Sequence, residues 1–258
     1  MASVKAKSGT TGVRKSAREQ ARLQAAAAQR RGRIIQILVI AAVALVVIGI
    51  IGTAAVISWV TQNSRRPDVD TTVTVAGKQL PMKVDGSAIR IGPEDAKVVI
   101  DLYIDYSCPH CKEYEAATGK TFEQLLAEGD VAVKYHPIQI VNQYGVRAGN
   151  ASAAVAAYQP QEWLAFHAAL FVNQTEQTAI WNNPDFKTFA EQNGITDPEA
   201  LKAIEDGQYS SWITGNTNDA VKKLGQELST PTLLINDQPQ ELLVGQQLID
   251  KVHELAGS

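Results

Sequence analysis

The chain of 258 residues contains only two cysteines, Cys108 and Cys111. Two cysteines do not complete a four-ligand zinc site, and the four histidines, at positions 110, 136, 167 and 253, are scattered along the chain. A bridge between cysteines this close together closes so small a loop that it stabilises a fold little. We therefore predict no metal site and no cofactor; half a zinc site and a purely structural disulfide remain the alternatives for this pair.

Charged residues are absent from Ile34 to Val60. A helix of roughly 20 apolar residues crosses a bilayer, so this run is long enough, and Trp59 stands where interfacial aromatic residues gather. The alternative is a cleaved signal peptide, because Thr53-Ala54-Ala55 offers small residues near the end of the run. The apolar core of a signal peptide usually has only about 7 to 15 residues. We predict a single, uncleaved transmembrane helix over residues 34–60.

Acidic residues are nearly absent before this run. Residues 1–33 carry nine Lys or Arg and one acid, Glu19, whereas residues 67–258 carry 13 basic and 26 acidic residues. Because basic flanks stay on the cytoplasmic side, we predict a basic cytoplasmic tail over residues 1–33 and a carboxyl-terminal domain outside the cell membrane. The tail's charge suits nucleic acid or anionic lipid. We favour a segment that sets the orientation of the protein in the membrane and rests on lipid head groups, and we predict no nucleic-acid partner.

The chain is organised around Cys108-Pro109-His110-Cys111. This motif follows an apolar, β-branched run, Val98 to Ile104, and precedes good helix formers up to Glu128. A Cys-x-x-Cys at such a strand-to-helix junction is typical of a redox site. The predicted membrane topology places this site in the oxidising compartment. Unpaired N–H groups and the macrodipole favour a thiolate at the helix start, and Cys111 lies one turn deeper on the same face. We predict that Cys108 is the sulfur that reacts with the substrate thiol and that Cys111 is the resolving cysteine of the mixed disulfide.

The thiolate needs more stabilisation than a helix alone provides. A macrodipole contributes about 0.3 to 1 kcal/mol, whereas lowering a pKa by one unit takes about 1.4 kcal/mol. We therefore expect backbone N–H groups and the imidazole of His110 to supply the remainder. Pro109 fixes a helical φ and has no competing N–H. A solvent-exposed His110 without a role is the alternative.

The rest of the chain predicts a mixed α/β domain. A linker over 61–70 leads into a domain over 71–258, whose helical insertion covers about 145–225. We predict that the insertion has an aromatic core and that Asn183 and Asp197 cap helices before their prolines. We expect His136 to be a plain surface or packing histidine, with an approach to the active site as the alternative. The closing helix should bury Leu248, Val252 and Leu255. The expected strands are Thr71–Val75, a hairpin around Gly86, Val98–Ile104, Val131–Ile138 with a parallel crossover, the apolar run after Pro231, and Gln240–Val244.

The order of these parts resembles the DsbA-like branch of the thioredoxin superfamily over Gly92 to Leu255. The most specific marks are the Cys-Pro-His-Cys motif and Thr230-Pro231-Thr232, which looks like the family's cis-proline loop. The resemblance implies an α/β, thioredoxin-like fold with an inserted all-helical subdomain, here preceded by a single transmembrane helix, as in membrane-anchored actinobacterial members. It also implies substrate binding at Thr230 and Pro231. The chain departs from the family at Leu102, where an acid is common, and at Thr230, where DsbA itself has valine.

The function that this resemblance implies is extracytoplasmic thiol:disulfide exchange through a Cys108–Cys111 bridge, with net oxidation of secreted proteins. The implied partners are unfolded secreted proteins with free thiols, the membrane, and a quinone-linked membrane reoxidant of the DsbB or vitamin K epoxide reductase (VKOR) type. We expect a monomer. The alternatives are a reductase or isomerase of the same fold, and a non-enzymatic, membrane-tethered binding or chaperone module.

Overall fold

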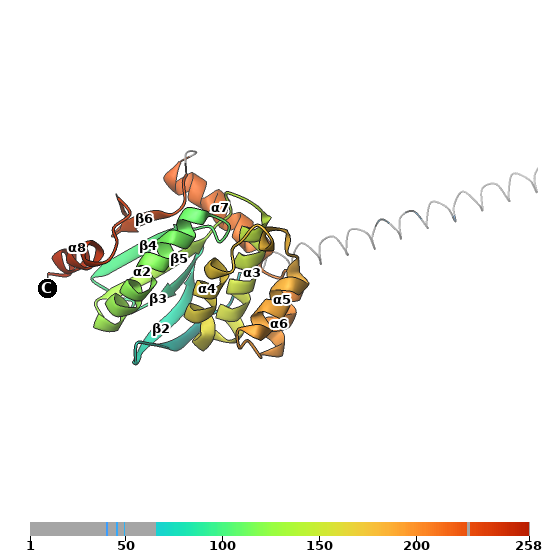
Figure 1. Cartoon of the computed structure of the whole chain (residues 1–258), viewed down its shortest axis with the longest axis horizontal. Helices are drawn as coiled ribbons and strands as arrows, with labels where there is room; N and C mark the ends of the chain where they lie inside the picture. The colour runs from blue at the N-terminus through green and yellow to red at the C-terminus, as the bar shows by residue number, and fades with distance from the viewer. Residues whose placement is uncertain (1–39, 41–44, 46–48, 50–65, 226–227, 258) are drawn as a thin grey trace, which may run out of the picture. The chain divides into compact units, whose positions relative to one another are not determined.

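The computed structural model describes residues 66–225 and 228–257, together with positions 40, 45 and 49 (Figure 1). The predicted cytoplasmic tail, most of the predicted transmembrane helix and the first half of the predicted linker therefore lie outside the described residues. Within the described part of the chain, no helix combines the length and the apolar character needed to cross a bilayer. The chain divides into two units, residues 1–59 and 60–258, and the fold below is that of the second.

One seven-stranded sheet forms the centre of this unit, in the order β1-β2-β3-β5-β4-β6-β7. Strands β4 and β5 run parallel, which confirms the predicted crossover through the intervening helix, and the other paired neighbours are antiparallel. The strands are β1 (Asp70–Val75), β2 (Lys78–Asp85), β3 (Ala88–Ile91), β4 (Val98–Ile104), β5 (Val131–Pro137), β6 (Thr232–Ile235) and β7 (Gln238–Gln240).

Strand β7 lies at the edge of the sheet and differs from the prediction. The predicted strand Gln240–Val244 is wrong, because the chain turns earlier, at Asn236 and Asp237, which both have positive φ. Two such residues make a tight hairpin turn, so pairing restarts at once at Gln238. Pro239 then occupies the middle of this edge strand.

The helices between β5 and β6 gather beside the sheet, and α5 and α6 lie on the outer side of α3 in Figure 1. Within the described residues of this segment there is no strand. The helices of the unit are α2 (Pro109–Glu128), α3 (Gln143–Tyr158), α4 (Trp163–Val172), α5 (Asn183–Gln192), α6 (Pro198–Asp206), α7 (Ser210–Leu224) and α8 (Gln246–Ala256), with short 3₁₀ turns η1 (Pro160–Glu162) and η2 (Thr178–Ile180).

Two of the helix starts test the predicted caps. Asp197 caps α6, as predicted, and its carboxylate accepts hydrogen bonds from the next two free N–H groups. The prediction of Asn183 as a cap is wrong by one residue. Asn182 caps α5 instead, because Asp185 reaches back to its N–H and completes a capping box.

The core follows the alternation of β4. Ile100, Leu102 and Ile104 join the main cluster with Phe122 and Leu125 of α2, which covers one face of the sheet. Residues Asp101 and Tyr103 have the opposite parity, and Tyr103 packs with a second cluster that includes Ala220 of α7. The two faces of β4 therefore pack against different helices, α2 on one side and α7 on the other.

The predicted aromatic core and closing helix are confirmed in most positions. Trp163, Phe166, Phe171, Phe186 and Phe189 are buried, and Trp181 packs against them partly exposed. Leu248 and Val252 of α8 are buried, but the prediction for Leu255 is wrong, since that side chain is 40% exposed. The apolar face of α8 continues from Val252 to Ala256, four residues later. Ala256, and not Leu255, packs against the core.

Candidate active site

The motif Cys108-Pro109-His110-Cys111 lies where β4 ends and α2 begins, as predicted. Cys108 is the extended residue before the helix, and Pro109 occupies the first turn, where its missing N–H costs no hydrogen bond. Both cysteines are in the thiol form and both are buried. Pro109 and His110 are exposed beside them. The pair therefore sits just below the surface at the amino end of a helix of 20 residues.

The pKa of Cys108 is lowered from the ordinary thiol value of 9.0 to about 5. The largest cause is the Cys111 thiol, whose S–H donates to the Cys108 sulfur. Partial burial opposes this effect, and the Thr230 side chain together with the backbone N–H groups of Cys111 and His110 add to it. Donors that face a sulfur favour its anion, so Cys108 is a thiolate at neutral pH.

Cys111 has the opposite character. The neighbouring Cys108 sulfur and burial both raise the pKa of Cys111 far above its usual value. The Asp105 backbone N–H points at Cys111 Sγ over 3.4 Å and partly offsets this effect. Cys111 therefore keeps its proton and shares it with Cys108, which gives the two sulfurs distinct roles.

The predicted role of the His110 imidazole is corrected by its position. The ring is 78% exposed, and its Nδ1 lies 3.3 Å from Glu113 Oε2. The part of His110 that contributes to the lowered pKa of Cys108 is its backbone N–H. An imidazole on the surface pairs with a neighbouring carboxylate one turn along the helix, whereas the amide is held at the thiolate by the helix start itself.

The predicted loop at Thr230 and Pro231 meets the cysteines. The Thr230–Pro231 peptide bond is cis, Pro231 is buried, and Thr230 is half-buried. When Cys108 is protonated, its S–H donates to the Thr230 carbonyl oxygen at 3.3 Å. The structure thus brings together all six residues predicted for the site, from two segments more than 100 residues apart.

Asp105 is a residue of this site that the sequence reasoning did not identify. Its carboxylate is fully buried and accepts four hydrogen bonds. One oxygen accepts from the Ser107 N–H at 2.7 Å and the Ser107 hydroxyl at 2.6 Å, and the other from the N–H groups of Ile140 and Val141 at 2.7 and 2.8 Å. Asp105 therefore links the chain segment that precedes Cys108 to the loop that follows β5. Its place three residues before the motif was the only available signal.

The position at which the family often has an acid is occupied here by leucine. Leu102 belongs to the core under α2. His136 is buried, which fits the packing role and not the surface role of the two that the prediction left open, and its Nε2 lies 2.7 Å from Asp101 Oδ1. Neither Asp101 nor His136 is a cause of the shifted pKa of either thiol.

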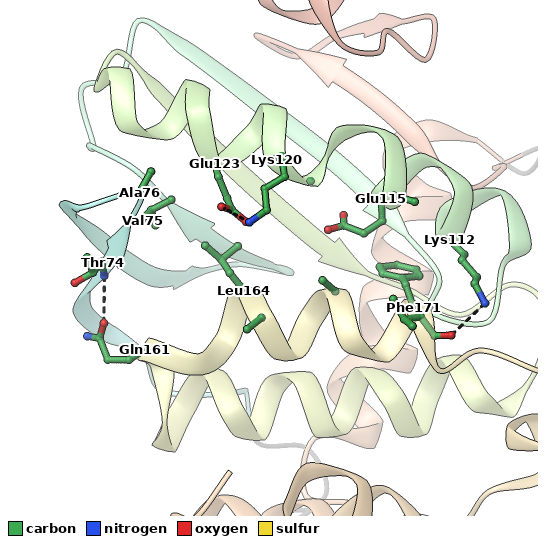
Figure 2. A pocket seen from close by; sticks show the side chains of 15 residues that line it. Thr74, Val75, Ala76, Lys112, Glu115, Lys120, Glu123, Gln161, Leu164 and Phe171 are labelled. Carbon is green, nitrogen blue, oxygen red and sulfur yellow. Dashed lines mark hydrogen bonds and ion pairs between the residues drawn. The ribbon is translucent and has the colours of Figure 1, made fainter. Parts of the chain in front are cut away.

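A cavity of about 520 Å³ lies beside α2 but does not include the cysteines. Figure 2 shows it between α2, α4 and β1, with Glu115 and Leu164 directed into it. Lys112 closes one end by donating to the Val172 carbonyl oxygen at 3.2 Å. Because neither sulfur lines it, we assign it no part in the thiol chemistry. Across the described residues, no group of three His, Cys, Asp or Glu side chains is arranged to hold a metal ion.

Comparisons with known proteins agree with this geometry. A family model described as Thioredoxin matches residues 85–248. The solved structure of reduced DsbA from Mycobacterium tuberculosis has a TM-score of 0.58 and 25% identity, covering 67% of this chain and 94% of that one. The reduced DsbG disulfide oxidoreductase of the same organism has a TM-score of 0.59 and 26% identity, covering 67% and 89%. Disulfide bond formation protein D from Bacillus subtilis (strain 168) is 26% identical over 150 residues, which are 57% of this chain and 67% of that protein.

Proposed function

This chain belongs to the thioredoxin family, and from that premise we propose that it is a DsbA-like enzyme that introduces disulfide bonds into secreted proteins. The family and its thiol:disulfide oxidoreductase relatives support the type of chemistry. The direction of exchange, the compartment and the partners are the proposal.

The reaction runs through the Cys108–Cys111 disulfide. A substrate thiolate attacks the Cys108 sulfur, the intramolecular S–S bond breaks, and Cys111 leaves with the electron pair and takes up a proton. A second substrate thiolate then attacks the substrate sulfur of the mixed disulfide and displaces Cys108 as a thiolate. The substrate loses two electrons and gains a disulfide, and the enzyme ends in the dithiol form that the structure shows.

The observation that carries the proposed direction is the contrast between the two sulfurs. A thiol with a pKa of about 5 is a good leaving group and is stabilised once released. A disulfide whose reduced form is stabilised is a strong oxidant. Transfer of the Cys108–Cys111 disulfide to a substrate is therefore favourable.

The proposed setting follows from the predicted transmembrane helix, most of which lies outside the described residues, and from the DsbA-type relatives. The catalytic domain would lie outside the cell membrane and act, as a monomer, on unfolded secreted proteins with free thiols. A quinone-linked membrane protein of the DsbB or VKOR type would restore the disulfide. Capture of the Cys111→Ala variant in mixed disulfides, followed by identification of the trapped proteins, tests both partners.

The direction is tested by the redox equilibrium of the full chain with glutathione. An oxidase should have a reduction potential above about −200 mV, whereas a structural disulfide lies below about −300 mV, and the latter result would contradict the proposal. The Cys108→Ala variant should lose all oxidation of a reduced substrate. A binding or chaperone module would keep its function in that variant, and a reductase or isomerase would act on scrambled disulfides faster than on free thiols.

A further inference from the structure

A second cluster of polar side chains lies on the α7 side of the sheet. His136 of β5 is buried between Ser87, in the turn between β2 and β3, and Asp101 of β4. The Ser87 hydroxyl lies 2.9 Å from His136 Nδ1, and Asp101 Oδ1 lies 2.7 Å from His136 Nε2. The Tyr103 ring stacks on the imidazole at 4.2 Å and fixes its plane. A hydroxyl, an imidazole and a carboxylate are thus connected in one line.

The chemistry of these groups fixes where the protons are. An ionised carboxylate only accepts hydrogen bonds, so His136 Nε2 carries a hydrogen that it donates to Asp101. Burial lowers the pKa of His136, which keeps the ring neutral although Asp101 opposes this effect, and Lys134 and Lys223 add to it. In a neutral ring with a hydrogen on Nε2, Nδ1 is a bare acceptor. The Ser87 hydroxyl therefore donates to Nδ1.

Ser87 also opens onto a cavity. This cavity has a volume of about 390 Å³, within the size range of small-ligand sites, and Arg66, Trp212 and Ser211 line it with Ser87. The Ser211 hydroxyl oxygen is buried and has no hydrogen-bond partner in the structure. This oxygen is enclosed rather than presented to the cavity, so of the two serines only Ser87 is a candidate for contact with a small molecule there.

We propose that Ser87 is the nucleophile of a second, hydrolytic site that takes small carboxylic esters and is independent of the cysteines. Hydrogen-bonded nucleophile, base and orienting acid are the recurrent arrangement of acyl-transfer enzymes on unrelated folds. Ser87 Oγ attacks the ester carbonyl while its proton passes to His136 Nδ1.

The remaining steps need only water. The alcohol leaves with the proton held by His136, and an acyl group remains on Ser87. Water then adds to the acyl carbon, gives a proton to His136, and releases the carboxylic acid as Ser87 takes that proton back. Asp101 holds the ring in the required tautomer throughout and is a positioning residue.

A serine-directed fluorophosphonate probe and p-nitrophenyl acetate test this site in the full chain. The protein is kept oxidised, because the Cys108 thiolate would itself react with the ester. The probe should label Ser87 by peptide mapping, and both labelling and hydrolysis should fall about 100-fold in Ser87→Ala and His136→Gln. The matched control is Ser210→Ala, a half-buried serine outside the cluster, which should keep both rates.

Two results would overturn the proposal. One is labelling of the wild-type chain that is no faster than that of Ser87→Ala, and the other is a Ser87 labelling rate that His136→Gln leaves unchanged. Exchange at Cys108 reports whether each variant is folded. If His136→Gln fails to fold, Asp101→Asn replaces it, and an unchanged rate and pH profile of labelling in that variant would equally contradict the site.

Discussion

Single atoms decide which of the two sulfurs in the active site carries the negative charge. Cys108 receives a thiol S–H and two backbone N–H groups, whereas Cys111 faces the Cys108 sulfur and is more deeply buried. The spacing of the motif predicts both cysteines and the order in which they react. It does not predict that the amide of His110, rather than its ring, serves the thiolate, because a sequence does not show which atom of a residue faces a neighbour.

The donated S–H of Cys111 can be tested by removing it. In Cys111→Ala the pKa of Cys108 should rise from about 5 toward 9.0, since the largest cause of its shift is lost. In the matched Cys111→Ser variant, a hydroxyl replaces the thiol as donor, so the pKa should rise less. The pH dependence of iodoacetamide alkylation of the reduced protein measures both values. Equal values in the two variants would contradict the assigned cause.

The buried carboxylate of Asp105 offers a second test at this scale. Each of its oxygens accepts two hydrogen bonds, so an amide NH₂ in Asp105→Asn must face two donors in either orientation. We expect the free energy of unfolding to fall by about 2 to 5 kcal/mol. The exposed control Asp95→Asn should change it by less than about 0.5 kcal/mol, as measured by urea denaturation. A neutral Asp105→Asn would show that Asp105 does not hold the loop after β5.

Whole helices and strands are predictable where the hydrophobic pattern and the residues that start or end an element agree. Strand β4 matches its predicted range, because an apolar run interrupted only by Asp101 identifies it. The start of α5 was placed one residue late, since Asn182 and Asn183 are equivalent by type and only the return bond from Asp185 selects the first. Asp105 escaped prediction for a related reason: its partners belong to the loop after β5, which sequence spacing does not bring near it.

The contact between α3 and Asp105 can be tested with two glycines in helices. A Cβ at Gly145, in the first turn of α3, would overlap the Asp105 carboxylate, whereas a Cβ at Gly215 in α7 meets nothing within 4 Å. Gly145→Ala should therefore lower the free energy of unfolding by roughly 1 to 3 kcal/mol. Gly215→Ala should raise it by about 0.4 to 1 kcal/mol, because alanine restricts the unfolded chain. Urea denaturation of both variants, side by side, checks the opposite signs.

At the scale of the whole molecule, the chemistry of one thiol sets the relative stability of two redox forms. The pKa of Cys108 is lower in the folded, reduced protein than in the unfolded chain. Its contribution to the stability of the reduced form is therefore complete above about pH 9, and is lost as the pH falls through about 5. The disulfide form has no such contribution.

We therefore expect the reduced chain to be more stable than the oxidised chain at pH 7.5, and the difference to shrink at pH 4.5. Urea midpoints of both forms at the two pH values measure this difference. The Cys108→Ser variant is the control, because it lacks the thiolate and should show no comparable change over this range. A difference that grows on acidification would contradict a stabilising thiolate.

Strand β7 has a further consequence for a protein proposed to work among unfolded chains. Sheet edges invite foreign strands, and an enzyme surrounded by nascent polypeptides is at constant risk of being extended into an aggregate. Proline is tolerated in an edge strand where its nitrogen faces away from the neighbouring strand, so Pro239 leaves a missing donor on the outer side of β7. An incoming segment therefore meets an interrupted row of hydrogen-bond donors on the outer side of β7, which makes this edge a poor template for a further strand.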